Sequence, residues 1–288
     1  MIVHLIDGTY ELFRHFYGIR RIGKGDPPFG AVRGVLQMVL QMIENGATHI
    51  GVATDHVIES FRNELWDGYK TGAGIDAALW AQFHPLEEAL TAMGVAVWPM
   101  VELEADDALA SAAALAAADP AVEKVCIWTP DKDLAQCVVA ERVVQVDRKS
   151  GKVRDAAGVR EKFGVAPKSI PDYLALVGDA ADGYPGLAGF GAKSTAAVLA
   201  RFEHIEAIPA DGAEWHAGVA GSGRLAATLN EQRELALLFR TLATLRSDAE
   251  LFDDVEHLRW RGPTEFFAAY AKKIDAPELD VRASRAVR

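Results

Sequence analysis

The chain has 288 residues, half of them hydrophobic and a quarter charged, which is the composition of a globular protein with one large or two small domains. It contains no apolar run near the roughly 20 residues of a membrane span, and its start lacks the basic segment of a signal peptide, so we expect a cytoplasmic protein that does not enter a membrane. Its net charge of −11 argues against a nucleic-acid-binding protein, unless the acidic residues are concentrated at one site.

Apolar runs alternate with helical patterns in the first half of the chain, which predicts a parallel sheet flanked by helices. The expected strands are residues 2–6, 50–54, 95–98, 125–129 and 143–147. The expected helices are residues 31–43, 77–93 and 105–118, and a turn at residues 149–152 leads into a small hairpin.

Acidic residues follow the first four expected strands. These residues come directly after a strand or at the start of the next helix, and they are Asp7, Asp55, Glu104, Asp106, Asp107, Asp131 and Asp133. A single Asp in such a place commonly caps a helix, but the carboxyl ends of parallel strands share one edge, where ligands bind. Carboxylates without His or Cys favour Mg²⁺ or Mn²⁺. The pattern therefore predicts a metal site at this edge of the sheet.

The second half is helical from about residue 156, apart from a Gly-rich stretch at residues 177–195. Asp179 and Asp182 flank a turn, and Gly186, Gly189 and Gly191 then shape a hairpin between the expected helices 170–177 and 192–202. A helix N-terminus after glycines presents free amides that suit a phosphate. Further helices are expected at residues 226–242 and 265–273, with a frayed tail at residues 280–288.

Two interpretations of the Gly-rich stretch compete. Gly186 to Ser194 resembles the phosphate loop G-x-x-x-x-G-K-[ST] of nucleotide hydrolases, but Ala192 intervenes before Lys193 and a helical run, not a strand, precedes it. A helix–hairpin–helix that grips a DNA backbone phosphate fits the spacing and the context better. A plain Gly-rich connection between helices is the remaining alternative.

Several motifs, in this order, resemble those of the bacterial 5′-3′ exonuclease and flap endonuclease family, which includes the N-terminal nuclease domain of DNA polymerase I. The motifs are Leu5-Ile6-Asp7-Gly8, Ser60-Phe61-Arg62 with Gly68-Tyr69-Lys70, Glu104-Ala105-Asp106-Asp107, Thr129-Pro130-Asp131-Lys132-Asp133, Gly178-Asp179 to Asp182, and Pro185-Gly186 to Lys193-Ser194. The similarity covers roughly residues 1–275, and we expect the stand-alone form of the family, without a polymerase domain.

The resemblance implies a PIN-like α/β fold, with a central, mostly parallel sheet flanked by helices. Residues 1–155 would form the metal-dependent nuclease core. Residues 156–288 would form a helical DNA-binding half with a helix–hairpin–helix of the H3TH type at residues 170–202, integrated with the core into one domain. The implied activity is that of a structure-specific 5′-3′ exonuclease and 5′-flap endonuclease that hydrolyses DNA in replication and repair.

The resemblance also implies a site with nine carboxylates and two or more Mg²⁺ or Mn²⁺ ions. The carboxylates are Asp7, Asp55, Glu104, Asp106, Asp107, Asp131, Asp133, Asp179 and Asp182. The first five would centre on one ion and the last four on the other. Setting these nine acids aside changes the net charge from −11 to −2, so the acidity no longer argues against DNA binding.

Further residues acquire expected roles from the same resemblance. Lys70 and Arg62 would contact the transferring phosphate. The duplex would be gripped by Gly186, Gly189, Gly191, Lys193 and Ser194, with a K⁺ ion on the hairpin carbonyls, and contacted by the basic residues Arg14, Arg20, Arg21 and Lys24. The expected partner is DNA with a 5′ flap, nick or gap, bound by a monomer with a functional link to a DNA polymerase and ligase.

The sequence departs from the family in two places. Gly183 stands where the family usually has Asn, after Ala180 and Ala181, and residues 71–93, which form an arch or clamp in relatives, contain no Lys or Arg. We therefore expect a weaker or shorter clamp. The departures leave open a catalytically weak protein that binds DNA junctions with a nuclease fold, and a PIN-type RNase is a further alternative.

Overall fold

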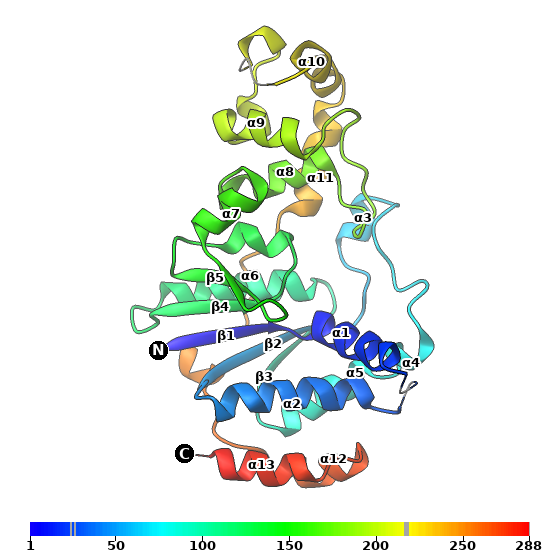
Figure 1. The fold of residues 1–288 in the computed structure, drawn as a ribbon, viewed down its shortest axis with the longest axis vertical. Coiled ribbons are helices and arrows are strands. Elements are labelled where there is room, and N and C mark those ends of the chain that lie inside the picture. The colour runs from blue at the N-terminus through cyan, green and yellow to red at the C-terminus, as the bar shows by residue number, and fades with distance from the viewer. Residues whose placement is uncertain (24, 26, 216–218, 288) are drawn as a thin grey trace. The chain divides into compact units, whose positions relative to one another are not determined.

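The computed structural model describes residues 1–23, 25, 27–215 and 219–287, and it divides into two compact units (Figure 1). The first unit comprises Met1–Ile58, Gly72–Thr129 and Arg246–Arg288, and the second comprises Glu59–Thr71 and Pro130–Leu245. Lys24, a predicted DNA-binding residue, lies outside the described residues. Among the helices of the described part, none has the length and apolar character needed to cross a membrane.

Four parallel strands form the centre of the first unit, in the order β3-β2-β1-β4. They are β1 (Ile2–Asp7), β2 (His49–Asp55), β3 (Ala96–Met100) and β4 (Lys124–Trp128). Each was expected at this place from its apolar run. Since β1 and β2 are in register with Leu5 opposite Gly51, they end at the same edge of the sheet.

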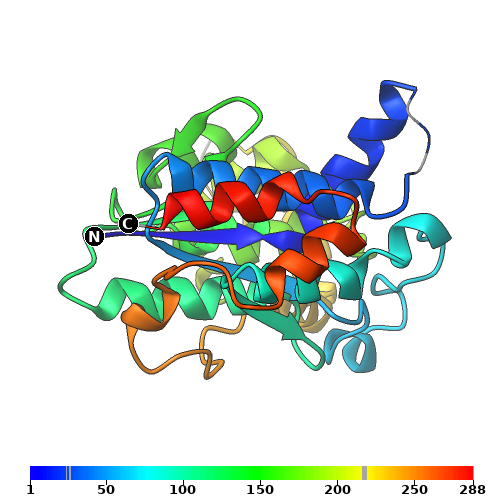
Figure 2. The ribbon, with the colours of Figure 1, turned by 90° about the horizontal axis from the view of Figure 1, so that it is seen from below.

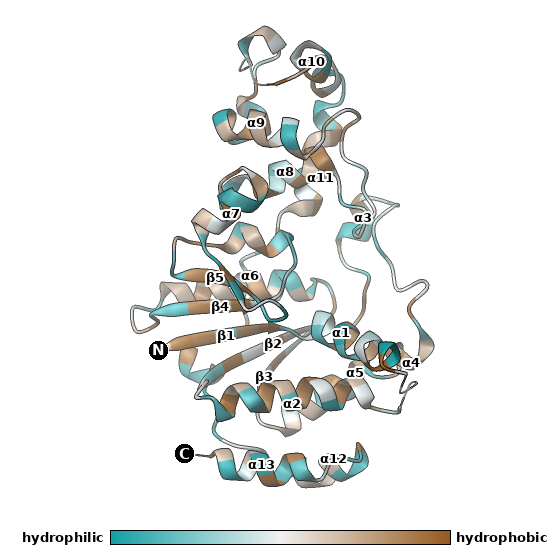
Figure 3. Cartoon of the chain, in the orientation of Figure 1, coloured by the Kyte–Doolittle hydropathy of each residue, from teal (hydrophilic) through white to brown (hydrophobic). Residues whose placement is uncertain are grey.

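Helices cover both faces of these strands. They are α1 (Gly8–Arg21), α2 (Gly30–Glu44), α4 (Ala77–Trp80), α5 (Phe83–Ala92), α6 (Ala105–Ala118), α12 (Phe267–Lys273) and α13 (Glu278–Ala286), with the 3-10 helix η5 (Val255–Leu258). Figure 2 shows α2 and α13 on one side of the strands and α6 on the other. Ile6 and Ile50 are buried in the core that α1, α2 and α5 cover, and Figure 3 shows the strands as mostly hydrophobic.

The single helix expected at residues 77–93 is wrong, because the segment forms α4 and α5. Pro85 lacks an N–H and its ring clashes with the carbonyl of the preceding turn, so a helix that contains it begins within one turn before it. The break leaves the buried side chain of Gln82 free to accept a hydrogen bond from Ala31 N (3.0 Å), which satisfies the first turn of α2.

The frayed tail expected at residues 280–288 is also wrong over α13. Leu279 and Ala283 lie four positions apart on one helix face and are fully buried in the first core. Arg282 on α13 pairs with Glu44 of α2 at 2.8 Å. The charged residues of this segment therefore form the outer face of an ordered helix.

The second unit is mainly helical, as expected from about residue 156 onward. It contains β5 (Val143–Asp147) and β6 (Lys152–Arg154), which pair antiparallel, and the helices α3 (Arg62–Leu65), α7 (Ala156–Phe163), α8 (Ile170–Val177), α9 (Ala192–Phe202), α10 (Ser222–Glu231) and α11 (Arg233–Ala243). Its 3-10 helices are η1 (Asp133–Cys137), η2 (Pro167–Ser169), η3 (Ile205–Ala207) and η4 (Gly212–Glu214). Their apolar faces form a second core.

One helix expected in this unit, residues 226–242, is in fact two. The chain leaves helical geometry at Gln232, which separates α10 from α11. Arg233 at the start of α11 donates hydrogen bonds to the carbonyls of Ile205 (2.9 Å) and Ile208 (3.1 Å). These tertiary contacts, not a Gly or Pro, accompany the break.

The Gly-rich stretch connects α8 to α9, as the helix–hairpin–helix prediction requires. Gly178 and Gly186 both have positive φ (89° and 69°), and a Cβ on Gly186 would lie 2.4 Å from Gly178 N. The two backbone segments can approach this closely only without side chains. The interpretation as a nucleotide phosphate loop is excluded, because helix α8 and not a strand precedes the glycines.

Candidate active site

In the first unit, the ends of β1 and β2 carry two of the predicted carboxylates. Asp7 is buried and caps α1: its Oδ1 accepts a hydrogen bond from Tyr10 N (2.8 Å) and its Oδ2 accepts one from Thr129 Oγ1 (3.0 Å). Asp55 Oδ1 accepts a hydrogen bond from Ala105 N (2.8 Å), which ties the end of β2 to the start of α6. The strand ends thus bring acidic groups to one edge, as expected for parallel strands.

The start of α6 carries three more acids. Glu104 precedes the helix and is buried, and Asp106 is partly buried on the first turn. Asp107 is fully buried, and its two oxygens accept hydrogen bonds from Glu104 N (3.0 Å) and Arg246 N (2.8 Å). This is the geometry of a helix cap that also holds a distant part of the chain. A metal-ligand role for Asp107 stays a prediction.

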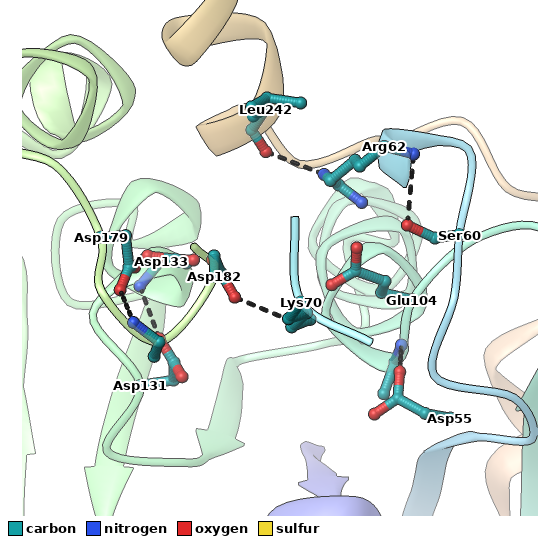
Figure 4. Close-up of polar contacts among 12 residues, drawn as sticks. Asp55, Ser60, Arg62, Lys70, Glu104, Asp131, Asp133, Asp179, Asp182 and Leu242 are labelled. Atoms are coloured by element: carbon teal, nitrogen blue, oxygen red, sulfur yellow. Dashed lines mark hydrogen bonds and ion pairs between the residues drawn. The ribbon is translucent and has the colours of Figure 1, made fainter. Parts of the chain in front are cut away.

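In the second unit, three buried carboxylates lie together (Figure 4). Single oxygens of Asp133, Asp179 and Asp182 lie within 4.8 Å of one another. Asp133 begins η1, whereas the other two flank a turn that Asp179 and Tyr184 close with backbone hydrogen bonds of 2.8 and 3.0 Å. Asp131 Oδ1 accepts a hydrogen bond from Asp133 N (3.0 Å), which fixes the loop before η1.

The carboxylate cluster is defined as Asp133, Asp179 and Asp182. Nearby lysines neutralise its negative charge only in part. Burial raises the pKa of Asp133 well above its usual range, and the neighbouring Asp131, Asp182 and Asp179 raise it further. Lys132 Nζ lies 2.5 Å from Asp179 Oδ2, and Lys70 Nζ lies 3.0 Å from Asp182 Oδ1. Burial would lower the pKa of Lys132, but Asp133 and Asp179 outweigh it and the pKa is raised.

The cluster has the chemistry of a site for a hard divalent cation. Its donors are all carboxylate oxygens, which Mg²⁺ and Mn²⁺ prefer. Within the described residues, the buried Asp133 Oδ1 has no hydrogen-bond donor. A buried acceptor without a donor is costly and commonly marks an ion or catalytic site. The residues present therefore fit a divalent ion.

Replacing Asp133 with Asn is expected to change how stability depends on pH in chelator. Because the pKa of Asp133 is raised on folding, its contribution to stability is complete at low pH and is lost as pH rises through the raised pKa. Asn mimics the protonated acid, so Asp133→Asn should show a shallower decline and should unfold at a higher temperature than the parent at alkaline pH. Thermal unfolding measured by circular dichroism across a pH series in EDTA tests this.

The matched control is Asp155→Asn, because Asp155 is a helix-capping acid whose Oδ1 accepts a hydrogen bond from Gly158 N (2.8 Å) and Asn retains that acceptor. It should follow the parent's pH dependence. If Asp133→Asn also followed the parent's pH dependence, the raised pKa of Asp133 would be contradicted.

The two predicted catalytic cations have different surroundings. Lys70 donates its backbone N–H to Asp182 O (3.0 Å), so backbone and side chain both hold it at the carboxylate cluster. Arg62 is 1% exposed, and its guanidinium donates to the carbonyl of Leu242 (2.8 Å; Figure 4). The guanidinium also donates to the carbonyl of Thr244 (3.1 Å). Arg62 thereby anchors the segment of Lys70 to the end of α11.

The hairpin and the first turn of α9 contain the five predicted duplex contacts. Gly186 and Gly189 have positive φ, whereas Gly191 precedes α9 in extended geometry. Ser194 Oγ accepts from Gly191 N (3.1 Å) and donates to Gly191 O (3.0 Å), and Lys193 is exposed. These residues lie together as predicted, and their contact with DNA stays a prediction.

Of the basic residues predicted near the N-terminus, three are described and all lie on α1. Arg14 Nε donates to Glu11 Oε2 (2.8 Å), and Arg20 pairs with Asp76 at 2.7 Å and lies 4.5 Å over the Phe16 ring. Arg21 is exposed. DNA contact by Arg14 or Arg20 would therefore compete with an ion pair inside the first unit.

Three residues around the acidic loop 131–133 were not predicted. Gln136 Nε2 donates to Asp133 O (2.9 Å), and Gln145 Nε2 donates to Asp131 O (2.5 Å). Arg154 donates to Gln145 Oε1 (2.8 Å). Isolated glutamines carry no sequence signal for a catalytic site, so only the strand register and the fold reveal these contacts.

Gly183, where the family usually has Asn, has a local explanation. Its φ is 85°, and a Cβ there would lie 2.0 Å from Gly68 O. Trp66 Nε1 donates a hydrogen bond to Gly183 O at 3.1 Å. The turn between Asp179 and Tyr184 thus packs so closely on the backbone of residues 66–70 that only Gly fits, and Asp182 stays in the cluster.

Comparison with known proteins covers both halves of the chain. The family model described as 5′-3′ exonuclease, N-terminal resolvase-like domain, matches residues 2–164, and the model described as 5′-3′ exonuclease, C-terminal SAM fold, matches residues 165–265. Among solved structures, the T5 D15 protein co-crystallized with metal ions has a TM-score of 0.67 at 16% identity, covering 99% of this chain and 98% of that one. The catalytic core of Rad2 in complex with DNA substrate has a TM-score of 0.64 at 15% identity, covering 99% and 92%.

Relatives at higher identity come from bacteria. DNA polymerase I of Pseudomonas aeruginosa is 34% identical over 268 residues, 88% of this chain and 28% of the polymerase, so the chain spans less than a third of that protein. Flap endonuclease Xni of Edwardsiella ictaluri is 32% identical over 264 residues, 91% of this chain and 99% of the relative.

The fold matches the expectation of a PIN-like α/β core followed by a helical half with a helix–hairpin–helix. The family prediction from ordered motifs is confirmed over most of the chain. The chain belongs to the 5′-3′ exonuclease family, whose members named here include a stand-alone flap endonuclease.

Proposed function

We propose that this protein is a structure-specific 5′ nuclease that hydrolyses DNA phosphodiesters as a 5′-3′ exonuclease and 5′-flap endonuclease, with Mg²⁺ or Mn²⁺. The observation that carries the proposal is the buried cluster of Asp133, Asp179 and Asp182, with Lys70 and Lys132 paired to it. Family membership supplies the reaction class, and the cluster supplies the chemistry for it in this chain.

The acids have two proposed groupings. Asp131, Asp133, Asp179 and Asp182 would hold one ion, and Asp7, Asp55, Glu104, Asp106 and Asp107 would hold another. Divalent ions, when bound, lower the pKa of a water and stabilise the leaving oxygen of a phosphodiester. The buried carboxylates of this chain would hold such ions, because their oxygen donors suit a hard divalent cation.

The two cations receive different roles. The Lys70 ammonium is about one-third exposed and is held by Asp182, so it is available to a phosphate oxygen at the cluster. Arg62 is buried against main-chain carbonyls, so we assign it the role of a positioning residue for the segment of Lys70. This assignment revises the phosphate contact expected of Arg62.

Duplex binding is proposed for the helical half, residues 156–288, and phosphodiester hydrolysis for the core, residues 1–155, together with Asp179 and Asp182 of the helical half. The first amides of α9, with Lys193 beside them, would meet a backbone phosphate, and hairpin carbonyls would hold a K⁺ ion. Phosphate contacts read shape and not sequence, and they weaken steeply with salt.

The proposed partner is DNA with a 5′ flap, nick or gap, bound by a monomer of this protein. Since a polymerase that displaces a strand would produce such a flap, and ligase would seal the nick left after the flap is cut, we propose a functional link to both enzymes.

A panel of end-labelled substrates tests this function. With Mg²⁺ or Mn²⁺, the purified chain should cut a DNA duplex with a 5′ flap near the junction and should degrade nicked and gapped duplexes from the 5′ end. EDTA should stop both reactions. The same flap made of RNA should be cut more slowly.

Two outcomes would contradict the proposal. Tight binding of the flap duplex without cleavage in either metal would favour the alternative of a junction-binding protein with a nuclease fold. Faster cleavage of the RNA flap would favour an RNase. The presence of Asp179 and Asp182 in the buried cluster, despite the change at Gly183, supports the catalytic alternative.

A further inference from the structure

The hairpin of β5 and β6 carries two buried polar side chains, Gln145 and Arg154, that are linked to the acidic loop of residues 131–133. Gln145 and Arg154 are cross-strand partners in the register, and they are 0% and 9% exposed. Arg154 Nη1 donates to Gln145 Oε1 (2.8 Å), and Gln145 Nε2 donates to Asp131 O (2.5 Å). A chain of two hydrogen bonds therefore runs from a buried guanidinium to the backbone of a predicted metal ligand.

Packing alone does not explain this arrangement. A buried cation is costly unless a carboxylate compensates it. Arg154 interacts electrostatically with Asp147 on β5, but the hydrogen bond described for its side chain goes to the neutral amide of Gln145. Its Nε has no hydrogen-bond partner within the described residues. The guanidinium polarises the amide of Gln145, which strengthens the hydrogen bond that Gln145 donates to Asp131 O.

The acidic loop is held from the opposite end as well. Gln136 Nε2 donates to Asp133 O (2.9 Å) and to Ala243 O (2.9 Å), while Asp131 Oδ1 accepts from Asp133 N (3.0 Å). The carbonyls of both Asp131 and Asp133 are thus fixed by glutamine amides. The backbone of the loop can keep its two carboxylates in one orientation although their charges repel.

We propose that Arg154 and Gln145 are positioning residues that hold the loop of Asp131 and Asp133 in the geometry that binds a divalent ion. The inference rests on the proposed function, because it assigns the supporting residues of the same site. It predicts that both residues set the affinity for the ion and the rate of cleavage without touching the DNA.

Positioning and simple charge repulsion predict opposite results at Arg154. A buried positive charge near the site would by itself weaken binding of a cation, so removing it would tighten binding. If the hydrogen-bond chain matters more, removing the charge weakens binding, and removing the Gln145 donor has the same effect. The two variants together therefore separate the two causes.

The experiment measures Mn²⁺ binding by isothermal titration calorimetry to the full chain without DNA. Gln145→Met and Arg154→Met should each weaken binding about tenfold or more, the size expected for outer residues of a metal site. Arg154→Lys should recover part of the loss, because an ammonium can still donate to Gln145 Oε1. In cleavage assays kcat should fall with the affinity for Mn²⁺, whereas KM for the flap duplex should not change.

The matched control is Lys152→Met on the same hairpin, since Lys152 is an exposed cation opposite Asp147 in the register. It should bind Mn²⁺ as the parent does. If the Met variants do not fold, Gln145→Glu decides, because it keeps an acceptor for Arg154 and lacks the donor to Asp131 O. Its added negative charge would favour a cation, so weaker binding would come from the changed contact with Asp131 O, where a donor is replaced by an oxygen that repels the carbonyl.

The outcomes distinguish this inference from the proposed function. If Asp133→Asn binds Mn²⁺ like the parent, the metal site itself is wrong. If Asp133→Asn abolishes binding while folded Gln145→Met or Gln145→Glu binds as the parent does, the positioning role is wrong. Tighter binding by Arg154→Met would likewise overturn it in favour of charge repulsion.

Discussion

Replacing Asp131 or Asp7 with Asn should lower the rate of 5′-flap cleavage on the order of a thousandfold, since several kcal/mol of metal-assisted stabilisation would be lost. Binding of the flap duplex should stay within a few fold of the parent, because the proposed phosphate contacts lie on the hairpin and α9. Single-turnover cleavage in Mg²⁺ and fluorescence anisotropy in EDTA measure the two quantities separately.

The fold should survive both changes. Asp7 Oδ1 accepts from Tyr10 N, and Asp131 Oδ1 accepts from Asp133 N, and an Asn side chain offers the same carbonyl acceptor. The variants therefore remove a negative charge and keep these two hydrogen bonds from backbone amides. At position 7 the Asn amide nitrogen would donate to Thr129 Oγ1, which reverses the hydrogen bond that Asp7 Oδ2 accepts. A loss of cleavage can then be assigned to the missing charge and not to unfolding.

The double variant tests whether the acids of both units serve one reaction. Residues that act as a unit show strongly non-additive effects, so Asp7→Asn with Asp131→Asn should be hardly slower than the slower single variant. Asp211→Asn, at an exposed acid that caps η4 through Ala213 N (2.8 Å), is the matched control and should cleave normally. Normal cleavage by either single variant would remove that residue from the active site.

Gly186→Ala should destabilise the second unit by about 3 kcal/mol, since it combines a left-handed backbone with overpacking. A Cβ there would lie 2.4 Å from Gly178 N and 2.6 Å from Leu176 O, and backbone atoms cannot move aside as a flexible side chain can. The unfolding temperature should fall by roughly 10 °C, and affinity for duplex DNA should fall with it, because the hairpin changes shape. Differential scanning calorimetry and anisotropy measure both.

Gly191→Ala is the matched control in the same hairpin. Gly191 has φ −123°, and a Cβ on it would meet nothing within 4 Å. Its stability should change by less than about 1 kcal/mol, the usual difference between Gly and Ala before a helix. Equal unfolding temperatures for Gly186→Ala and the parent would show that the close approach to Gly178 does not constrain the hairpin.

The elements that the sequence predicted best are those with one dominant local signal. The Ala-rich run after Glu104 forms α6 at residues 105–118, as expected, and the apolar runs form β1 to β5 near their predicted places. Helix α13 was missed because its charged residues suggested a tail, although Leu279 and Ala283 have helical spacing. Its order depends on packing against α2, which no local pattern reports.

The candidate site was predictable to the extent that strand ends and motifs define it. Strand ends led to Asp131 and Asp133, but only the family resemblance supplied Asp179 and Asp182, because a turn between a helix and a hairpin carries no acid-specific signal. Gln145 and Arg154 were beyond either approach, since their pairing depends on the register of β5 with β6. The burial of Arg62 against the carbonyl of Leu242 could not be predicted either, because the motif identifies Arg62 but does not indicate what its side chain contacts.

The first unit is assembled from three separate stretches, and its core includes Phe267, Ile274 and Leu279. The ribosome makes β4 well before these residues, and at ordinary rates of synthesis the delay is on the order of ten seconds. During that interval the surface of α2 that α13 later covers is exposed to water and to other chains. Overexpression should therefore yield aggregates most readily when the final helices are shortened, even though they lie far in sequence from every acid of the site.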